Sequence, residues 1–529
     1  MKILITDGLS QEGLNVFKSY PELEVDIKKD IGKEELLGIV SCYEGLIVRS
    51  GTKVTKDVIE AGGGRLKVIG RAGIGVDNVD VKAATKKGIV VMNTPEANAI
   101  TTAEHTIALM FALVRNIPQA HFSLKSGEWK RELFKGTELY QKTLGIIGLG
   151  KIGRLVAERA MGIKMEVIAY DPFLSDGSVE KLGIEPVSLE GLMSRADVIT
   201  VHTPLTSDTK NMINTESISK MKRGVIIINC ARGGIVNEAD LARALRSGYV
   251  GGASIDVYEK EPPDKTNPLF SIDSHVVHTP HLGASTAEAQ AKVGVAMAEQ
   301  IVDFFKTGEV RNAVNMPSVS REIIKVLKPY LVLSEKLGKL MGQICRSGIK
   351  EISIEYSGEA AEYDTKPLTV SFMKGFLTPI MDIPINHVNA LVIAGDRGIS
   401  LVESKHSKPE DYTSLITVNI RTDKARRSVA GTVFGENELR IVSMAGFSID
   451  AVPEGCLLVS ENYDVPGVIG SLCTKLGELG INIGRMHLGR ESLGGKAIAL
   501  INIDSPVPDD VVVEISKLPN IINVTQVEL

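Results

Sequence analysis

Cysteine is scarce in this sequence. Only five of the 529 residues are Cys, and no two of them form a Cys-x-x-Cys pair. That content argues against a disulfide framework and against a cysteine-held zinc site. We therefore expect no metal and a cytoplasmic location.

Long apolar runs and an excess of positive charge are also missing. The first residues, MKILITDGLSQEG, lack the apolar core of a signal peptide. No run of about 18 uninterrupted apolar residues occurs, so no membrane span is expected. The net charge of -5 gives no basic face for nucleic acid. A chain of 529 residues is too long for one core, so we expect three or four domains.

The sequence does contain two series of alternating strands and helices. The first covers residues 1–97, and the second begins near residue 143 with the strand TLGIIGLG. Such alternation predicts an α/β fold with two doubly wound parallel sheets. Residues 98–140 read as mostly helical, and their start is apolar nearly all round, which indicates burial against another domain or subunit.

A glycine motif opens the second series. Gly148, Gly150 and Gly153 have G-x-G-x-x-G spacing after an apolar strand, and Asp171 ends the next strand. In a dinucleotide site these glycines permit a tight turn, approach of the pyrophosphate and close helix packing. Asp171 would bind the ribose hydroxyls and repel a 2′-phosphate, so NAD is predicted rather than NADP.

Three later strand ends carry ionisable residues, namely Arg232 in NCARGGIV, Glu261 in DVYEKEPP and His281 in TPHLGAST. Each alone has an ordinary structural explanation, such as an ion pair or a solvated loop charge. Together they offer a base for a hydroxyl proton, a carboxylate that orients it and a guanidinium for a substrate carboxylate. They predict oxidation of a 2-hydroxy acid. Asp256 either contacts the cofactor carboxamide or serves as a structural cap.

These motifs, with GLGKIG and VHTPLT, closely resemble the D-isomer-specific 2-hydroxyacid dehydrogenases over roughly residues 1–315. The resemblance implies Arg232 as the carboxylate binder, Glu261 as the orienting acid and His281 as the acid/base. It also implies a discontinuous substrate domain, residues 1–97 and 286–315, with a Rossmann NAD domain at residues 98–285. Carried over in the same way, the NAD contacts would include Lys151, Ile152, Asp171, Thr203, Cys230, Ala231, Asp256, Gly283 and Ala284.

The first series supplies the expected substrate contacts. A backbone nest in RAGIGVDNVD is placed to receive a carboxylate, and nearby arginines either grip a distal phosphate or form surface salt bridges. The motifs RSGTKVT, GRAGIGVDN, MNTPEANA and FKGTEL are similar to the branch of the family that oxidises D-3-phosphoglycerate, the first step of phosphorylated L-serine biosynthesis. The expected substrate residues are Arg49, Ser50, Arg71, Gly73, Ile74 and Gly75.

The C-terminal part divides into two further units. Residues 316–453 resemble the mixed α+β intervening domain of long-form relatives. Residues 454–529 follow a ferredoxin-like βαββαβ order and resemble an ACT domain, a module that often binds amino acids between paired copies. That resemblance implies an L-serine effector contacting Tyr463, Asp464 and Asn482, in a homo-oligomer. The alternative is a purely dimerising module.

Two other functions stay open at this point. One is a glyoxylate or hydroxypyruvate reductase on the same scaffold, although the two C-terminal domains argue against it. The other is a binding protein that senses NAD without turnover. The basic loop with Lys130, Arg131 and Lys135, which surrounds the single Trp, is either solvated or reaches a partner's active site in a symmetric dimer.

Overall fold

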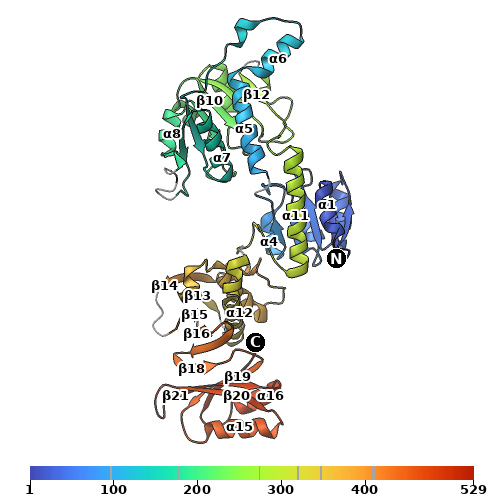
Figure 1. The fold of residues 1–529 in the computed structure, drawn as a ribbon. Helices are drawn as coiled ribbons and strands as arrows, with labels where there is room; N and C mark the ends of the chain where they lie inside the picture. The colour runs from blue at the N-terminus through green and yellow to red at the C-terminus, as the bar shows by residue number, and fades with distance from the viewer. Residues whose placement is uncertain are drawn as a thin grey trace.

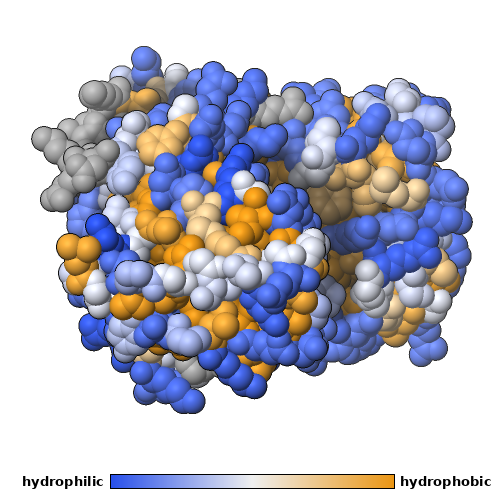
Figure 2. Space-filling view, turned by 90° about the horizontal axis from the view of Figure 1, so that it is seen from below, coloured by the Kyte–Doolittle hydropathy of each residue, from blue (hydrophilic) through white to orange (hydrophobic). Residues whose placement is uncertain are grey.

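The computed structural model is elongated and contains four sheets along its length (Figure 1). It describes residues 1–95, 98–174, 179, 182–272, 275–317, 321–345, 348–406 and 412–529. The expected domain boundary at residue 97 lies outside the described residues. Within them, no helix is long and apolar enough to cross a membrane. Seen from the end formed by the C-terminal sheet, hydrophobic and hydrophilic side chains intermix on the surface (Figure 2).

The first sheet has five parallel strands in the order β2-β1-β3-β4-β5. Helix α11 (Ala287–Thr307) returns to this sheet and packs against α1, and Met92 then bridges to Ala313. The returning segment thus completes the first sheet's core, as the expected discontinuous domain requires. The other elements are β1 (Lys2–Ile5), α1 (Gln11–Lys18), β2 (Glu24–Ile27), α2 (Lys33–Ile39), β3 (Gly45–Val48), α3 (Lys56–Ala61), β4 (Val68–Arg71), α4 (Val81–Lys86) and β5 (Val90–Met92).

The second sheet has seven parallel strands in the order β12-β11-β10-β9-β6-β7-β8, so the prediction of two doubly wound sheets is confirmed. Helix α5 (Ala99–Val114) packs chiefly on α7 and β11 of this same unit, and its buried side chains belong to that unit's core, so its apolar character is explained without another domain or subunit. The remaining elements are α6 (Ile117–Lys125), β6 (Thr143–Ile147), α7 (Lys151–Gly162), β7 (Glu166–Tyr170), β8 (Glu185–Pro186), α8 (Leu189–Arg195), β9 (Val198–Val201), α9 (Thr215–Ser219), β10 (Val225–Asn229), α10 (Glu238–Arg246), β11 (Val250–Ile255) and β12 (Val276–His278).

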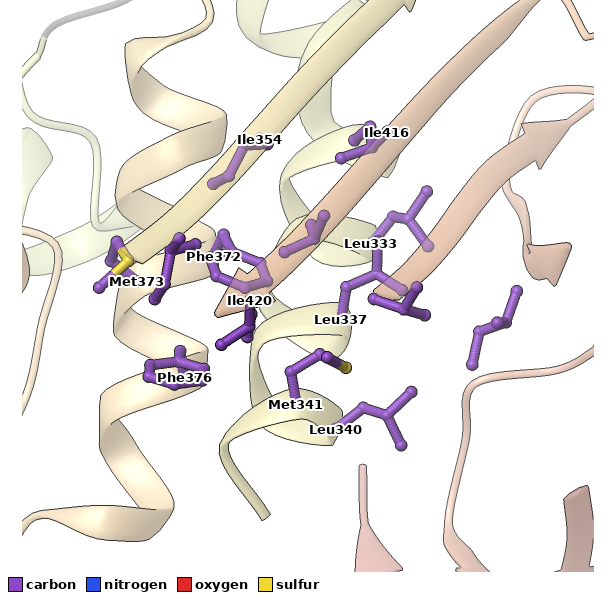
Figure 3. Packing of buried hydrophobic residues seen from close by; sticks show 14 of the residues in the cluster. Leu333, Leu337, Leu340, Met341, Ile354, Phe372, Met373, Phe376, Ile416 and Ile420 are labelled. Carbon is purple, nitrogen blue, oxygen red and sulfur yellow. The ribbon is translucent and has the colours of Figure 1, made fainter. Parts of the chain in front are cut away.

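The third sheet is mixed, with the order β14-β13-β15-β16-β17-β18 and one parallel pair, β13 with β14. Its core forms where α12 and α13 cover one face of the sheet, with Leu337, Phe372 and Ile420 meeting in the interior (Figure 3). The elements are α12 (Arg321–Ile344), β13 (Ile349–Gly358), α13 (Lys366–Leu377), α14 (Ala390–Asp396), β14 (Ser400–His406), β15 (Ser414–Thr422), β16 (Arg426–Phe434), β17 (Glu438–Met444) and β18 (Phe447–Ala451).

The fourth sheet is antiparallel in the order β20-β21-β19-β22, which confirms the ferredoxin-like prediction. Buried Leu458, Leu472 and Ile501 are part of the core between this sheet and its two helices. The elements are β19 (Cys456–Tyr463), α15 (Val468–Glu478), β20 (Ile483–Arg490), β21 (Lys496–Ile503), α16 (Asp509–Ile515) and β22 (Ile521–Glu528).

Candidate active site

A cavity of about 570 Å³ lies between the first two sheets, and loops that follow their strands line it. This is the position expected for ligands in open α/β sheets, outside the carboxyl ends of the strands. The cavity brings together most of the expected residues from both series, and the sheets therefore form one site. The expected residues that line it are Arg49, Ser50, Arg71, Gly73, Ile74, Gly75, Ile152, Thr203, Cys230, Ala231, Arg232, Glu261, His281, Gly283 and Ala284.

His281 and Glu261 form a hydrogen-bonded pair at the wall of this cavity. Nδ1 of His281 lies 2.7 Å from Oε2 of Glu261, and the backbone N–H of Tyr258 donates to Oε1 at 3.1 Å. Burial raises the pKa of Glu261, but the hydrogen bond and charge of His281 outweigh it and hold that pKa below its ordinary value. The ionised carboxylate fixes the proton on Nδ1, which leaves Nε2 of His281 free to accept a proton.

Asp256 anchors the loop that carries His281. Its carboxylate is fully buried and accepts from the Thr279 hydroxyl at 2.6 Å and from the backbone N–H groups of Leu282 and Gly283 at 2.7 and 2.9 Å. His105 Nε2 lies 3.3 Å from the same carboxylate. These contacts support the structural alternative for Asp256, and they stabilise a loop in which His281 has a φ of 57°, a costly value for a residue other than glycine. The sequence did not single out His105, because its partner lies far along the chain.

Arg232 lies against the loop expected to receive the substrate carboxylate. Its Nε donates to Oδ2 of Asp77 at 2.7 Å, and its Nη1 donates to the carbonyl of Ala231 at 2.6 Å. A Cβ on Gly75 would lie 1.8 Å from Nη2 of Arg232, so only glycine leaves room for the guanidinium there. Asp77 also lines the cavity and was missed in the sequence, where nothing in VDNVD marks it.

Arg49 and Arg71 face the same cavity. The Nε of Arg71 is buried with no hydrogen-bond partner among the described residues. Burial, together with the nearby charge of Arg232, lowers the pKa of Arg71 to about 10, so the guanidinium stays charged at neutral pH. Asp7 holds the Arg49 loop by accepting from the backbone N–H groups of Arg49 and Thr52 at 2.6 and 3.0 Å. The cluster has the chemistry of an anion site.

The glycine motif fits a dinucleotide. Gly148 has a φ of 91°, and a Cβ on Gly153 would lie 2.2 Å from the carbonyl oxygen of Gly148, so both positions require glycine. Gly150 is the N-cap of α7 and has open space where a Cβ would stand, which leaves its backbone accessible to a pyrophosphate. Asp171 accepts from the backbone N–H of Leu149 at 2.9 Å and is placed at the end of β7.

The expected cofactor residues divide into two groups by position. One group lines the cavity, as given above. The other group does not line it and consists of Gly148, Gly150, Lys151, Gly153, Asp171 and Asp256. His202 also lines it and was not predicted. Its Nδ1 is buried without a partner among the described residues, and burial lowers its pKa to about 4, so this imidazole is neutral.

One chain does not bring the expected effector residues together. Tyr463 pairs with Lys496 at the start of β21, whereas Asn482 donates to Asp504, which follows the end of β21. Eight residues of extended strand separate these ends by about 25 Å. Asp464 is paired with Arg490 at 3.2 Å.

Comparisons with known proteins agree with the fold and with the expected cofactor. Residues 107–283 match the family model described as the D-isomer specific 2-hydroxyacid dehydrogenase, NAD binding domain, and residues 326–445 match the D-3-phosphoglycerate dehydrogenase intervening domain. A solved D-lactate dehydrogenase from Aquifex aeolicus, in complex with NAD and lactic acid, is 28% identical and covers 60% of this chain and all of its own, with a TM-score of 0.54. The fold and site thus define an NAD-dependent 2-hydroxyacid dehydrogenase, and the NAD prediction is confirmed.

Full-length relatives narrow the class. A D-3-phosphoglycerate dehydrogenase from Methanocaldococcus jannaschii is 45% identical over the whole of both chains. One from Bacillus subtilis is 41% identical and covers all of this chain and 99% of its own. The chain belongs to the D-3-phosphoglycerate dehydrogenase family. The site residues and the domain boundaries, which these comparisons do not test, stay predictions.

Proposed function

We propose that the chain oxidises D-3-phosphoglycerate to 3-phosphohydroxypyruvate with NAD, the first step of phosphorylated L-serine biosynthesis. One observation carries this proposal, namely that a single cavity is lined by the His281–Glu261 pair and by three arginines, Arg49, Arg71 and Arg232. A 2-hydroxy acid with a distal phosphate presents two anionic groups to such a cluster. The expected cytoplasmic location stays a prediction.

Each residue has a distinct part in the reaction. Arg232 binds the substrate carboxylate and polarises the C2 oxygen. Nε2 of His281 takes the hydroxyl proton, while Glu261 holds the ring in place and stabilises the imidazolium that forms. Bound NAD would supply the acceptor for the hydride at C2. The C2 hydroxyl thereby becomes a carbonyl, and the proton rests on His281.

Arg49 and Arg71 distinguish the proposed reaction from that of a glyoxylate or hydroxypyruvate reductase. Glyoxylate has no distal anion, so it would leave the charged Arg71 cluster without a partner. Initial rates of NADH formation with D-3-phosphoglycerate and with D-glycerate test the choice. A strong preference for the phosphorylated acid is expected. Equal or better rates with D-glycerate would remove Arg49 and Arg71 as phosphate ligands, and no rate with either acid would favour the NAD-sensing alternative.

We infer a homo-oligomer from an apolar arm that projects from the second sheet (Figure 1). The arm contains α6 and the following turn, and it exposes Phe122, Trp129 and Leu133 by 72%, 82% and 69%. Exposed clusters of large apolar side chains are typical of protein interfaces. In a symmetric dimer Lys130, Arg131 and Lys135 of this arm would reach the partner's active site. Light scattering on the purified chain should give a mass of at least a dimer.

The L-serine effector requires pairing of two copies as well, here through their C-terminal units. Because Tyr463 and Asp464 lie about 25 Å from Asn482 within one chain, an amino acid can contact both groups only between two copies. Millimolar L-serine should therefore change the rate or the melting temperature of the oligomer. No change in either would leave the ACT unit as a dimerising module.

A further inference from the structure

A carboxylate on the substrate side of the cavity contacts the arginine expected to bind the substrate. Asp77 lies in the loop between β4 and α4, and its Oδ2 is 2.7 Å from Nε of Arg232, which follows β10 in the other sheet. The two residues both line the cavity and follow strands of different sheets, so their contact joins the two units that form it. We propose that Asp77 is a positioning residue that holds Arg232 in the orientation in which it binds the substrate carboxylate. This inference rests on the proposed function.

The hydrogen bonds of Arg232 show how the positioning works. A guanidinium has five N–H donors in a rigid plane. Asp77 takes the Nε donor, and the Ala231 carbonyl takes one Nη1 donor at 2.6 Å. Two bonds to separate anchors fix the plane of the group, and they leave Nη2 and the second Nη1 donor for a carboxylate. The Nη2 atom lies over Gly75, within the loop expected to receive that carboxylate.

The charges around the cavity explain why Arg232 needs an anchor. Arg49 and Arg71 line the same cavity and repel it. Among the described residues that line the cavity, the carboxylates are Asp77 and Glu261, and Glu261 is bound to His281. Asp77 is therefore the carboxylate free to offset this repulsion. Its side chain is 64% exposed, and exposed ion pairs contribute little to stability, so the fold alone does not account for the contact.

The test compares Asp77→Ala, Asp77→Asn and Asp77→Glu with a matched control. Asp57 forms an ion pair with Lys33 in the same domain at 2.9 Å and is 61% exposed, so Asp57→Asn removes a similar charge pair away from the cavity. Asp77→Ala should lower kcat/KM for D-3-phosphoglycerate about tenfold, chiefly by raising KM. Asp77→Glu should recover part of the loss, and Asp57→Asn should behave as the native enzyme. NADH affinity, measured by fluorescence titration, should not change.

A purely structural effect is distinguishable from positioning. Loss of folded protein would lower the apparent kcat and leave KM unchanged. In an Arg232→Ala background, moreover, Asp77→Ala should cause no further loss, because the group that it positions is gone. Additive losses would overturn the inference, as would an unchanged kcat/KM. A lower KM in Asp77→Ala would also overturn it, because Asp77 would then compete with the substrate for Arg232.

The proposed function can fail separately. If the native enzyme oxidises D-glycerate but not D-3-phosphoglycerate, the proposed substrate is wrong. The Asp77 series is then run with D-glycerate, because the carboxylate that Arg232 binds is common to both acids. The same rise in KM is expected there, and its absence refutes the positioning role whichever acid is the substrate.

Discussion

Adding one methyl group at Gly75 should disable the substrate site and leave the fold intact. A Cβ at this position would lie 1.8 Å from Nη2 of Arg232 and 2.8 Å from Oδ2 of Asp77. Both atoms are at the far ends of flexible side chains, so they can move aside without disturbing the backbone. Gly75 does not have a positive φ, so alanine is not strained there. The displaced group, however, is the guanidinium expected to bind the substrate carboxylate.

The size of the effect follows from the hydrogen bonds that are lost. A hydrogen bond to a charged group contributes about 1.5–3 kcal/mol, and two such bonds join a guanidinium to a carboxylate. A displaced Arg232 retains part of that interaction through its long side chain, so we expect a loss of about 3 kcal/mol in transition-state binding. That corresponds to roughly a 100-fold fall in kcat/KM.

Three measurements test this prediction. Steady-state kinetics with D-3-phosphoglycerate give kcat/KM, a thermal melt gives the stability, and an NADH titration gives the cofactor affinity. Gly75→Ala should show the fall in kcat/KM, with the melting temperature and the NADH affinity close to native values. The control is Gly64→Ala, where a Cβ would meet nothing within 4 Å, and it should behave as the native enzyme. A kcat/KM within twofold of native in Gly75→Ala would refute the placement of Arg232 over this loop in the reacting complex.

Three further substitutions test the remaining parts of the site. His281→Ala should keep NADH binding but lower turnover by about 10²–10⁴-fold, because the proton acceptor is removed, and near-normal turnover would contradict that role. Glu261→Gln should move the acid limb of the pH–rate profile to lower pH. The native carboxylate, whose pKa is held below its ordinary value by His281, stabilises the imidazolium, and the amide does not. An unmoved limb would show that Glu261 only packs. Asp171→Asn should keep an acceptor for the Leu149 N–H. It should also raise the rate with NADP about tenfold, because the repulsion of the 2′-phosphate is removed. An unchanged NADP rate would mean that another residue sets the preference for NAD.

Local sequence patterns predicted the fold because each unit is built from short periodic elements. The alternation of strands and helices gave the two parallel sheets, and the glycine spacing located the start of α7. The expected catalytic residues Arg232, Glu261 and His281 line one cavity because each follows a strand of one sheet. The carboxyl ends of parallel strands necessarily meet at one edge.

Contacts between side chains far apart in the sequence could not be predicted in the same way. Asp77 is 155 residues from Arg232, and His105 lies far from Asp256, so no spacing rule connects them. The effector residues show the converse case. Tyr463 and Asn482 are close in sequence, but the strand order β20-β21-β19-β22 places them at opposite ends of β21. Separation in sequence says little about distance once the order of strands in a sheet differs from their order in the chain.

The intervening domain contacts the first unit at α4 and just after it. Lys86, the last residue of this helix, lies 2.9 Å from Asp396, and Asn386 donates to the carbonyl of Gly88 at 2.7 Å. The first residue of α4 is Val81, four positions after Asp77. A helix of six residues spans about 9 Å, so we predict that a displacement of the intervening domain at one end is transmitted to the substrate loop at the other. Because the glycine motif lies on the other sheet, we expect an effector that acts by this route to change KM for the hydroxy acid more than the affinity for NAD, and a change in NAD affinity alone would contradict the route.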